Sequence, residues 1–200
     1  MTDRSVLRYP QLAIDEPSRH QLSLLRARRI DQQQRQRLES VLGAPLPEVP
    51  NASTSGDREI LWLAPNQWLI RAADTELDIA ARIDDACRGM LFHVADVTDA
   101  WRAVEIDGRR SADLIAKGCS LDLHPTVFRV GQAKRSLLSQ IHVLLHRISG
   151  SGYRIYFDVS VWDHVVQWLK VSAEEFRRDP ALEGDAETRR DGQILLAPMS

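Results

Sequence analysis

A short glycine–serine turn followed by an alternating strand is the strongest constraint on how this chain can fold. Ser149-Gly150-Ser151-Gly152 has the composition of a hairpin turn, and it follows an apolar strand candidate at 141–148. In the next strand the side chains alternate: Tyr153, Ile155, Phe157 and Val159 point one way, and Arg154, Tyr156 and Asp158 point the other. Ser160 and Asp163 then open a helix whose apolar side is formed by Val161, Trp162, Val165, Val166 and Leu169. This order predicts an antiparallel sheet with a helix packed on it.

The rest of the chain shows the same mixture of strands and interspersed helices. We expect further strands at 23–27, 59–64, 68–72, 90–97, 101–106 and 132–137. Helices are expected from Asp31 to a stop at Gly43, after the start signal Thr75-Glu76-Leu77-Asp78, and after Ser111. Prolines and glycine predict a loop at 44–57. The predicted fold class is α+β, with two small packed α/β halves and mainly antiparallel sheets.

The pattern divides the chain into four parts. Residues 1–20 have mixed charge and no sustained period, which predicts an extended arm that is disordered or laid on a partner. Residues 21–95 and 96–176 form the first and second α+β halves. Residues 177–200 are charged and have lost the period, which is typical of a flexible or partner-bound tail.

Composition excludes several classes of function. The formal net charge is −2, so the chain lacks the positive excess that a nucleic-acid-binding protein needs. No apolar run has the length of a membrane span, and the first residues do not have the pattern of a signal peptide. The two cysteines form no disulfide framework or metal-spaced cluster, and the cytoplasm is the expected location.

Cys119 is the obvious candidate nucleophile, with Lys117 two residues before it and His124 five residues after it. A nearby lysine favours the thiolate, whereas the end of a helix disfavours it. We therefore interpret Cys119 as a structural cysteine, and fast alkylation that abolished function would contradict that interpretation. Cys87 lies on the apolar stripe of its helix and is expected to be a small core residue.

The remaining polar residues do not predict a catalytic or metal site. His142 and His146 fall on one face of a strand about 13 Å apart, too far to share a metal ion. Gly150 and Gly152 lie between two strands rather than at the start of a helix that could hold a phosphate. His93, His124 and His164 form no spaced set, and the acids Asp96, Asp99, Glu105 and Asp107 are expected to be solvated edge residues.

Several spaced segments, in order, resemble the gamma subunit of heterotetrameric sarcosine oxidase. The resemblance covers about residues 20–172. Its segments are Leu63-Ala64-Pro65-Asn66-Gln67-Trp68-Leu69-Ile70, Asp96-Val97-Thr98, Ala103-Val104-Glu105-Ile106-Asp107-Gly108, Lys117-Gly118-Cys119-Ser120-Leu121-Asp122-Leu123-His124-Pro125, Phe128 with Gly131, Arg135-Ser136-Leu137-Leu138, and the strand from Tyr153 to Val159 with its helix. Ala64 stands where that family usually has glycine.

The resemblance implies a reduced form of the folate-binding aminomethyltransferase fold and a place in a four-chain flavoenzyme. Such a complex demethylates sarcosine oxidatively to glycine, reduces oxygen to hydrogen peroxide and can transfer the one-carbon unit to tetrahydrofolate. The resemblance places FAD, FMN and NAD on the large alpha and beta chains and zinc on the delta chain, and it implies that tetrahydrofolate also belongs to partner subunits. It implies that the gamma chain packs on alpha and has no catalytic, cofactor-binding or metal-binding residue of its own.

Two other interpretations stay open. Lys117-Gly118-Cys119 also resembles a motif of free-standing folate-binding proteins linked to iron–sulfur maintenance, but Ser120-Leu121-Asp122 departs from the aromatic and Gly-Gln-Glu that follow it there. The third possibility is an interaction module of another amine oxidase complex. An isolated subunit is further expected to form a homodimer if its docking face is partly apolar.

Overall fold

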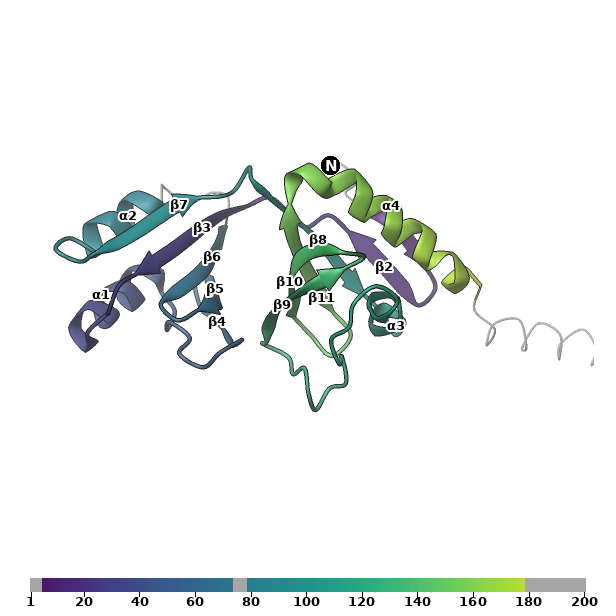
Figure 1. Cartoon of the computed structure of the whole chain (residues 1–200), viewed down its shortest axis with the longest axis horizontal. Coiled ribbons are helices and arrows are strands. Elements are labelled where there is room, and N and C mark those ends of the chain that lie inside the picture. Colours follow the sequence, from purple (N-terminus) through teal and green to yellow (C-terminus); the bar gives the residue numbers. More distant parts are fainter. Residues whose placement is uncertain (1–4, 74–78, 179–200) are drawn as a thin grey trace, which may run out of the picture.

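The computed structural model describes residues 5–73 and 79–178, and these form two antiparallel sheets that face each other. We call the two parts the first lobe (20–96) and the second lobe (5–15 and 101–176). In Figure 1 the helices lie on the outer side of each sheet, so that the inner faces of the two sheets meet in the middle. None of the helices in the described part of the chain is long and apolar enough to cross a membrane.

The first lobe has a five-stranded sheet with the order β4-β5-β6-β3-β7. Asp31 caps its first helix as expected, by accepting a hydrogen bond from the backbone N–H of Gln34, and Gly43 ends that helix with a left-handed backbone. The elements are β3 (His20–Ala27), α1 (Gln32–Leu42), β4 (Ser53–Ser55), β5 (Glu59–Ala64), β6 (Gln67–Ala73), α2 (Ile79–Ala86) and β7 (Phe92–Asp96). The predicted start signal at 75–78 lies outside the described residues. The predicted loop at 44–57 contains the short strand β4, which the proline-rich composition concealed.

The second lobe has a six-stranded sheet with the order β1-β2-β8-β11-β10-β9. Its elements are β1 (Ser5–Tyr9), β2 (Leu12–Asp15), β8 (Trp101–Asp107), α3 (Ser111–Ala116), β9 (Ala133–Leu138), β10 (Ile141–Arg147), β11 (Tyr153–Asp158), the 3₁₀ turn η1 (Val159–Val161), α4 (Trp162–Ala173) and η2 (Glu174–Phe176). The expected hairpin around Gly150 joins β10 to β11, with Arg147 opposite Tyr153. Ser111 is the first residue of α3 rather than its cap, and its hydroxyl donates a hydrogen bond to the carbonyl of Ser151.

The prediction of an extended arm at 1–20 was wrong for the described residues of that range. Residues 5–15 form the hairpin β1–β2, and β2 pairs with β8, placing Ala13 opposite Asp107. Leu12 and Ile14 are buried in the core under α3 and α4. The partner strand of β2 lies more than 80 residues further along the chain, so local periodicity could not indicate this pairing.

The two sheets meet through an apolar core between the lobes. Leu22, Leu61, Leu63 and Leu69 from the first lobe pack on Ala133, Leu144 and Tyr156 from the second. Consequently β11 is buried on both faces: Ile155 and Phe157 face the helices, whereas Arg154 and Tyr156 face the other sheet. The burial of an arginine at this interface creates the polar cluster described next.

Candidate functional site

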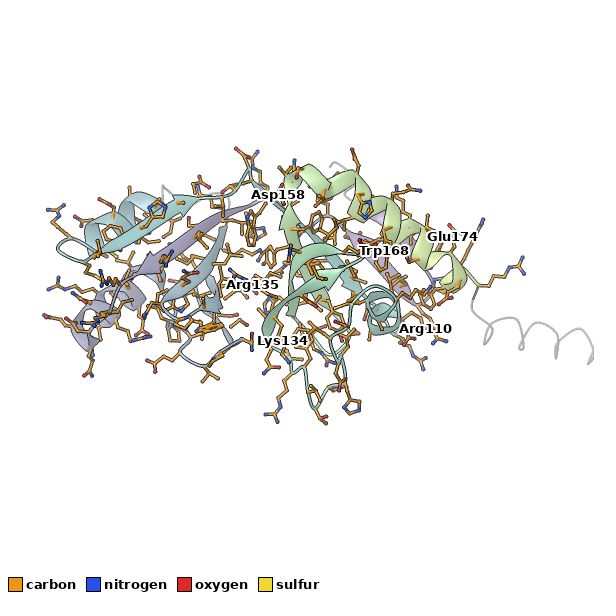
Figure 2. The ribbon with its side chains drawn as sticks, viewed as in Figure 1. Arg110, Lys134, Arg135, Asp158, Trp168 and Glu174 are labelled. Carbon is orange, nitrogen blue, oxygen red and sulfur yellow. The ribbon has the colours of Figure 1, made fainter. Side chains whose placement is uncertain are left out.

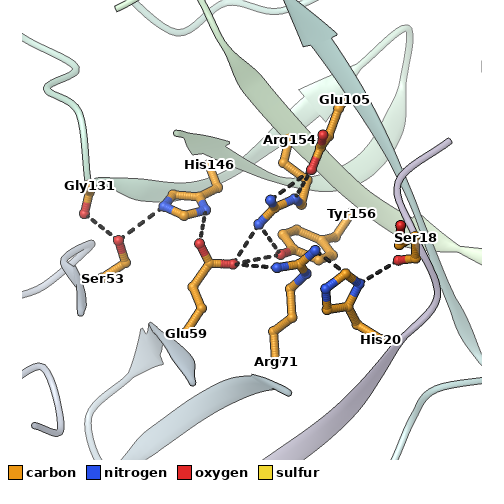
Figure 3. A network of polar contacts seen from close by, with 10 residues as sticks. All are labelled: Ser18, His20, Ser53, Glu59, Arg71, Glu105, Gly131, His146, Arg154 and Tyr156. Atoms are coloured by element: carbon orange, nitrogen blue, oxygen red, sulfur yellow. Dashed lines mark hydrogen bonds and ion pairs between the residues drawn. The ribbon is translucent and has the colours of Figure 1, made fainter. Parts of the chain in front are cut away.

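A polar cluster joins the inner faces of the two sheets (Figure 3). Its centre is Glu59 on β5. Its second-lobe members are Arg154 and Tyr156 on β11, His146 on β10 and Glu105 on β8. Arg71 on β6 completes the group from the first lobe. The strands fix these positions, because side chains two residues apart on one strand point to the same face.

Arg154 is the most strongly bound member of the cluster. Its Nη1 lies 2.5 Å from Glu59 Oε2, and its Nε and Nη2 each lie 2.7 Å from Glu105 Oε1. The Arg154 side chain is 9% exposed and that of Glu59 17%, so the pair is largely removed from water. Burial lowers the pKa of Arg154, but Tyr156, Glu59 and Glu105 outweigh it and leave the pKa raised. Arg154 therefore stays charged and links a carboxylate of the first lobe to one on β8.

Tyr156 and Arg71 close the cluster around Glu59. The Tyr156 hydroxyl accepts a hydrogen bond from Arg154 Nη1 at 3.3 Å and donates one to Glu59 Oε2 at 3.4 Å. Burial raises the pKa of Tyr156, so its hydroxyl stays protonated. Arg71 Nη1 lies 3.8 Å from Glu59 Oε2, and its Nη2 lies 3.0 Å from Nδ1 of His20. Two carboxylates thus balance two guanidinium groups, and the cluster as a whole is neutral.

His146 contacts a serine through one ring nitrogen and faces a glutamate with the other, which is the arrangement of contacts found in catalytic triads. Its Nε2 lies 3.0 Å from Ser53 Oγ, and its Nδ1 lies 3.7 Å from Glu59 Oε1. However, Ser53 Oγ donates its hydrogen to the carbonyl of Gly131 at 2.8 Å, and Glu59 is committed to Arg154. Burial lowers the pKa of His146 to about 4, which makes it a weak base at neutral pH. The contacts of this triad-like set therefore tie β4 to β10 and do not activate the serine.

The residues singled out in the sequence are mostly dispersed by the fold. Cys119 is 7% exposed, with its Sγ 3.4 Å from Ser136 Oγ, and Lys117 forms an ion pair with Glu175 at 2.8 Å. Burial raises the pKa of Cys87 to about 11. The His124 ring bonds Thr126 at 2.8 Å in an exposed loop, and His93, His142 and His164 are exposed. In residues 5–73 and 79–178 no three His, Cys, Asp or Glu side chains come together as a possible metal site.

The four acids have separate roles. Asp96 accepts the backbone N–H of Thr98, Asp99 pairs with Arg19, and Asp107 accepts a bond from Ser151. Glu105 alone belongs to the polar cluster, so its interpretation as a solvated edge residue was wrong. The sequence reasoning also missed Glu59, Arg71 and His146. Their only signal was that ionisable side chains belong to largely apolar strands.

The arrangement of two facing sheets with outer helices defines the class of fold. A structure of glycine cleavage system aminomethyltransferase T from Bartonella henselae matches 80% of this chain and 46% of its own, with a TM-score of 0.59 and 14% identity. This likeness supports the predicted folate-binding-like aminomethyltransferase fold.

The family follows from closer relatives. A model of the sarcosine oxidase gamma subunit family matches residues 29–175. The sarcosine oxidase subunit gamma of Corynebacterium sp. (strain P-1) is 30% identical over 146 residues, covering 72% of this chain and 71% of the relative. The corresponding Arthrobacter subunit is 29% identical over 141 residues, covering 70% and 69%. A chain of heterotetrameric sarcosine oxidase from Corynebacterium sp. U-96, in complex with pyrrole 2-carboxylate, matches with a TM-score of 0.80 and 25% identity over 88% of this chain and 90% of its own. The chain belongs to the sarcosine oxidase gamma subunit family, as its sequence motifs indicated.

Proposed function

We propose that this chain is a non-catalytic subunit of a heterotetrameric sarcosine oxidase and that it packs on the alpha subunit. The observation that carries the proposal is the structural match over nearly the full length of both chains to a member of such a complex. The proposed complex is cytoplasmic and contains beta and delta subunits as well. It demethylates sarcosine to glycine with production of hydrogen peroxide and transfer of the one-carbon unit to tetrahydrofolate.

In this proposal the FAD, FMN, NAD, tetrahydrofolate and zinc are held by the partner subunits. The polar cluster of this chain supports that assignment, because its charges are already matched by one another: Arg154 by Glu59 and Glu105, and Arg71 by Glu59. The role of the cluster is to hold one sheet against the other.

Co-expression with the cognate alpha, beta and delta chains tests the assembly. We expect one four-chain species by size exclusion with light scattering, and sarcosine-dependent hydrogen peroxide from it. A complex that carries Ser53→Ala or Cys119→Ala should retain its turnover, because neither side chain reacts. Loss of turnover with an intact complex would contradict the non-catalytic role.

Two further measurements use the isolated chain. Calorimetric titration with tetrahydrofolate should give no binding heat if the cofactor belongs to a partner, whereas saturable binding would favour the free-standing folate-binding protein. Size exclusion of the same sample tests whether the isolated chain forms a homodimer, which we expect if an apolar docking face is left uncovered.

A further inference from the structure

The outer edge of β9 carries backbone groups that point away from the sheet. β9 is the last strand of the six-stranded sheet, with β10 as its neighbour on one side. At its first residue, the N–H of Ala133 donates across the other edge to the carbonyl of Asn51. Because the direction of hydrogen bonding alternates along a strand, the N–H and C=O of Arg135 and Leu137 also point outward. Within the described residues these outward groups make no hydrogen bond, so they can accept another strand.

The side chains along this edge can give a strand partner specificity. Leu137 is 44% exposed and lies on the inner face of the sheet, two residues from Arg135. It borders a hollow of about 730 Å³ that is also lined by Trp101, Leu144 and Tyr156. A strand added at an edge gains affinity from its backbone and specificity from such hollows for alternate side chains.

The charge of the edge indicates an acidic partner. On β9, Lys134 and Arg135 form no ion pair within the described residues, although the whole chain has a net charge of −2. Lys134 does not block the edge, because its Nζ bonds the carbonyl of Val127 and lies 5.2 Å from the centre of the Phe128 ring. Arg135 is exposed on the side where the two lobes meet (Figure 2). Pairing of β9 with a second copy would bring like charges together, which destabilises neighbouring strands.

We propose that the β9 edge from Arg135 to Leu137 binds an extended, acidic segment of a partner subunit, which adds to the sheet as a seventh strand. The inference rests on the proposed assembly into a four-chain complex. An acidic side chain of the segment pairs with Arg135, and an apolar one lies in the hollow beside Leu137.

Variants of the co-expressed complex test the two parts of this docking site. Arg135→Glu reverses the charge, and we expect it to lower the recovery of the four-chain complex about tenfold or more. Leu137→Pro removes the outward N–H without touching a bond to β10, and it should weaken assembly more than Leu137→Ala does. Arg37→Glu on the outer helix α1 and Val171→Ala on α4 are the matched controls, since both residues are exposed. Each variant chain must unfold at the wild-type temperature when measured alone.

Hydrogen–deuterium exchange adds a direct readout with the unmodified chain. The amides of Arg135 and Leu137 should exchange more slowly in the four-chain complex than in the isolated chain. Equal exchange in both samples, or edge variants that assemble as well as the controls, would overturn the docking site while leaving the assembly intact. If the isolated chain is a dimer and Leu137→Pro converts it to monomers, the β9 edge binds a second copy of this chain, and the proposed partner segment is wrong. Failure of the wild-type chain to assemble would instead remove the proposed function itself.

Discussion

Two arginines on the inner face of the same sheet have opposite surroundings. Arg154 on β11 is 9% exposed in its side chain and contacts two carboxylates, one from each lobe. Arg135 on β9 is exposed and forms no ion pair with any described residue. Both strands are neighbours of β10, so the two guanidinium groups belong to one continuous surface.

The difference separates a charge that holds the chain together from a charge that is available to another chain. A buried guanidinium is costly unless its carboxylates are in place, so Arg154 specifies how the lobes fit. An exposed guanidinium stays hydrated at little cost and can pair with a carboxylate of another chain. Each of the following changes tests whether this division of roles is correct.

The largest expected effect is the loss of Arg154. Arg154→Met leaves Glu59 and Glu105 without their main partner, which should lower the free energy of unfolding by about 3–5 kcal/mol. Urea unfolding of the isolated chain measures the change. In the double variant Glu59→Leu with Arg154→Met, no unpaired carboxylate is left at Glu59, so part of the loss should be recovered, although Arg71 loses its carboxylate partner. A double variant less stable than the single one would show that the cluster does more than balance charge.

The pH dependence of stability should depend on His146. Burial lowers its pKa from 6.5 to about 4 in the folded chain. Between pH 6.5 and 4 the unfolded chain therefore binds a proton here that the folded chain excludes, and the free energy of unfolding falls as the pH falls. The full loss is roughly 3 kcal/mol below pH 4, and none of it is present above pH 6.5. Wild type and His146→Gln, unfolded in urea at a series of pH values, should diverge in slope over that window; parallel curves would mean that His146 is not excluded from protonation.

The Tyr156 hydroxyl should contribute less to the free energy of unfolding than Arg154 or His146. Tyr156→Phe keeps the apolar packing against the first lobe but removes the hydroxyl between Arg154 and Glu59. The expected cost is about 1.5 kcal/mol, the lower end for a hydrogen bond to a charged group, because the two bonds are long at 3.3 and 3.4 Å. Thermal unfolding can detect it, and Tyr153→Phe, on the opposite face of β11, is a matched control for the loss of a phenol. An unchanged midpoint for Tyr156→Phe would show that the hydroxyl adds nothing to the stability that the charged members of the cluster provide.

The sequence predicted the local features of this comparison well. The alternation from Tyr153 to Asp158 and the glycine–serine turn before it identified β11 and its hairpin, since both signals lie within ten residues. Asp31 and Gly43 likewise marked both ends of α1. These features depend on neighbours along the chain, which periodicity and capping rules describe.

The parts that could not be predicted depend on distant pairing. Alternation placed Arg154 and Ile155 on opposite faces of β11. The face that carries Arg154 is covered by the second sheet rather than by water, and the partner Glu59 on that sheet is 95 residues away in the sequence. The same limit concealed β2, which pairs with β8, and His146, whose partners Ser53 and Glu59 come from the first lobe. An ionisable residue on the inner face of a largely apolar strand, as at His146 and Arg154, is the one local sign of such a buried cluster.

The smallest expected effect on stability, and the sharpest contrast with Arg154, belongs to Arg135. Arg135→Met should change the free energy of unfolding of the isolated chain by no more than about 0.5 kcal/mol, because an exposed and unpaired side chain loses little. In the four-chain complex the same substitution should weaken assembly, whereas Arg37→Met on α1 should not. Urea unfolding of the isolated chain and size exclusion of the co-expressed complex give the two numbers. A large loss in the isolated chain would place Arg135 with Arg154 among the internal contacts, and the distinction between the two arginines would fail.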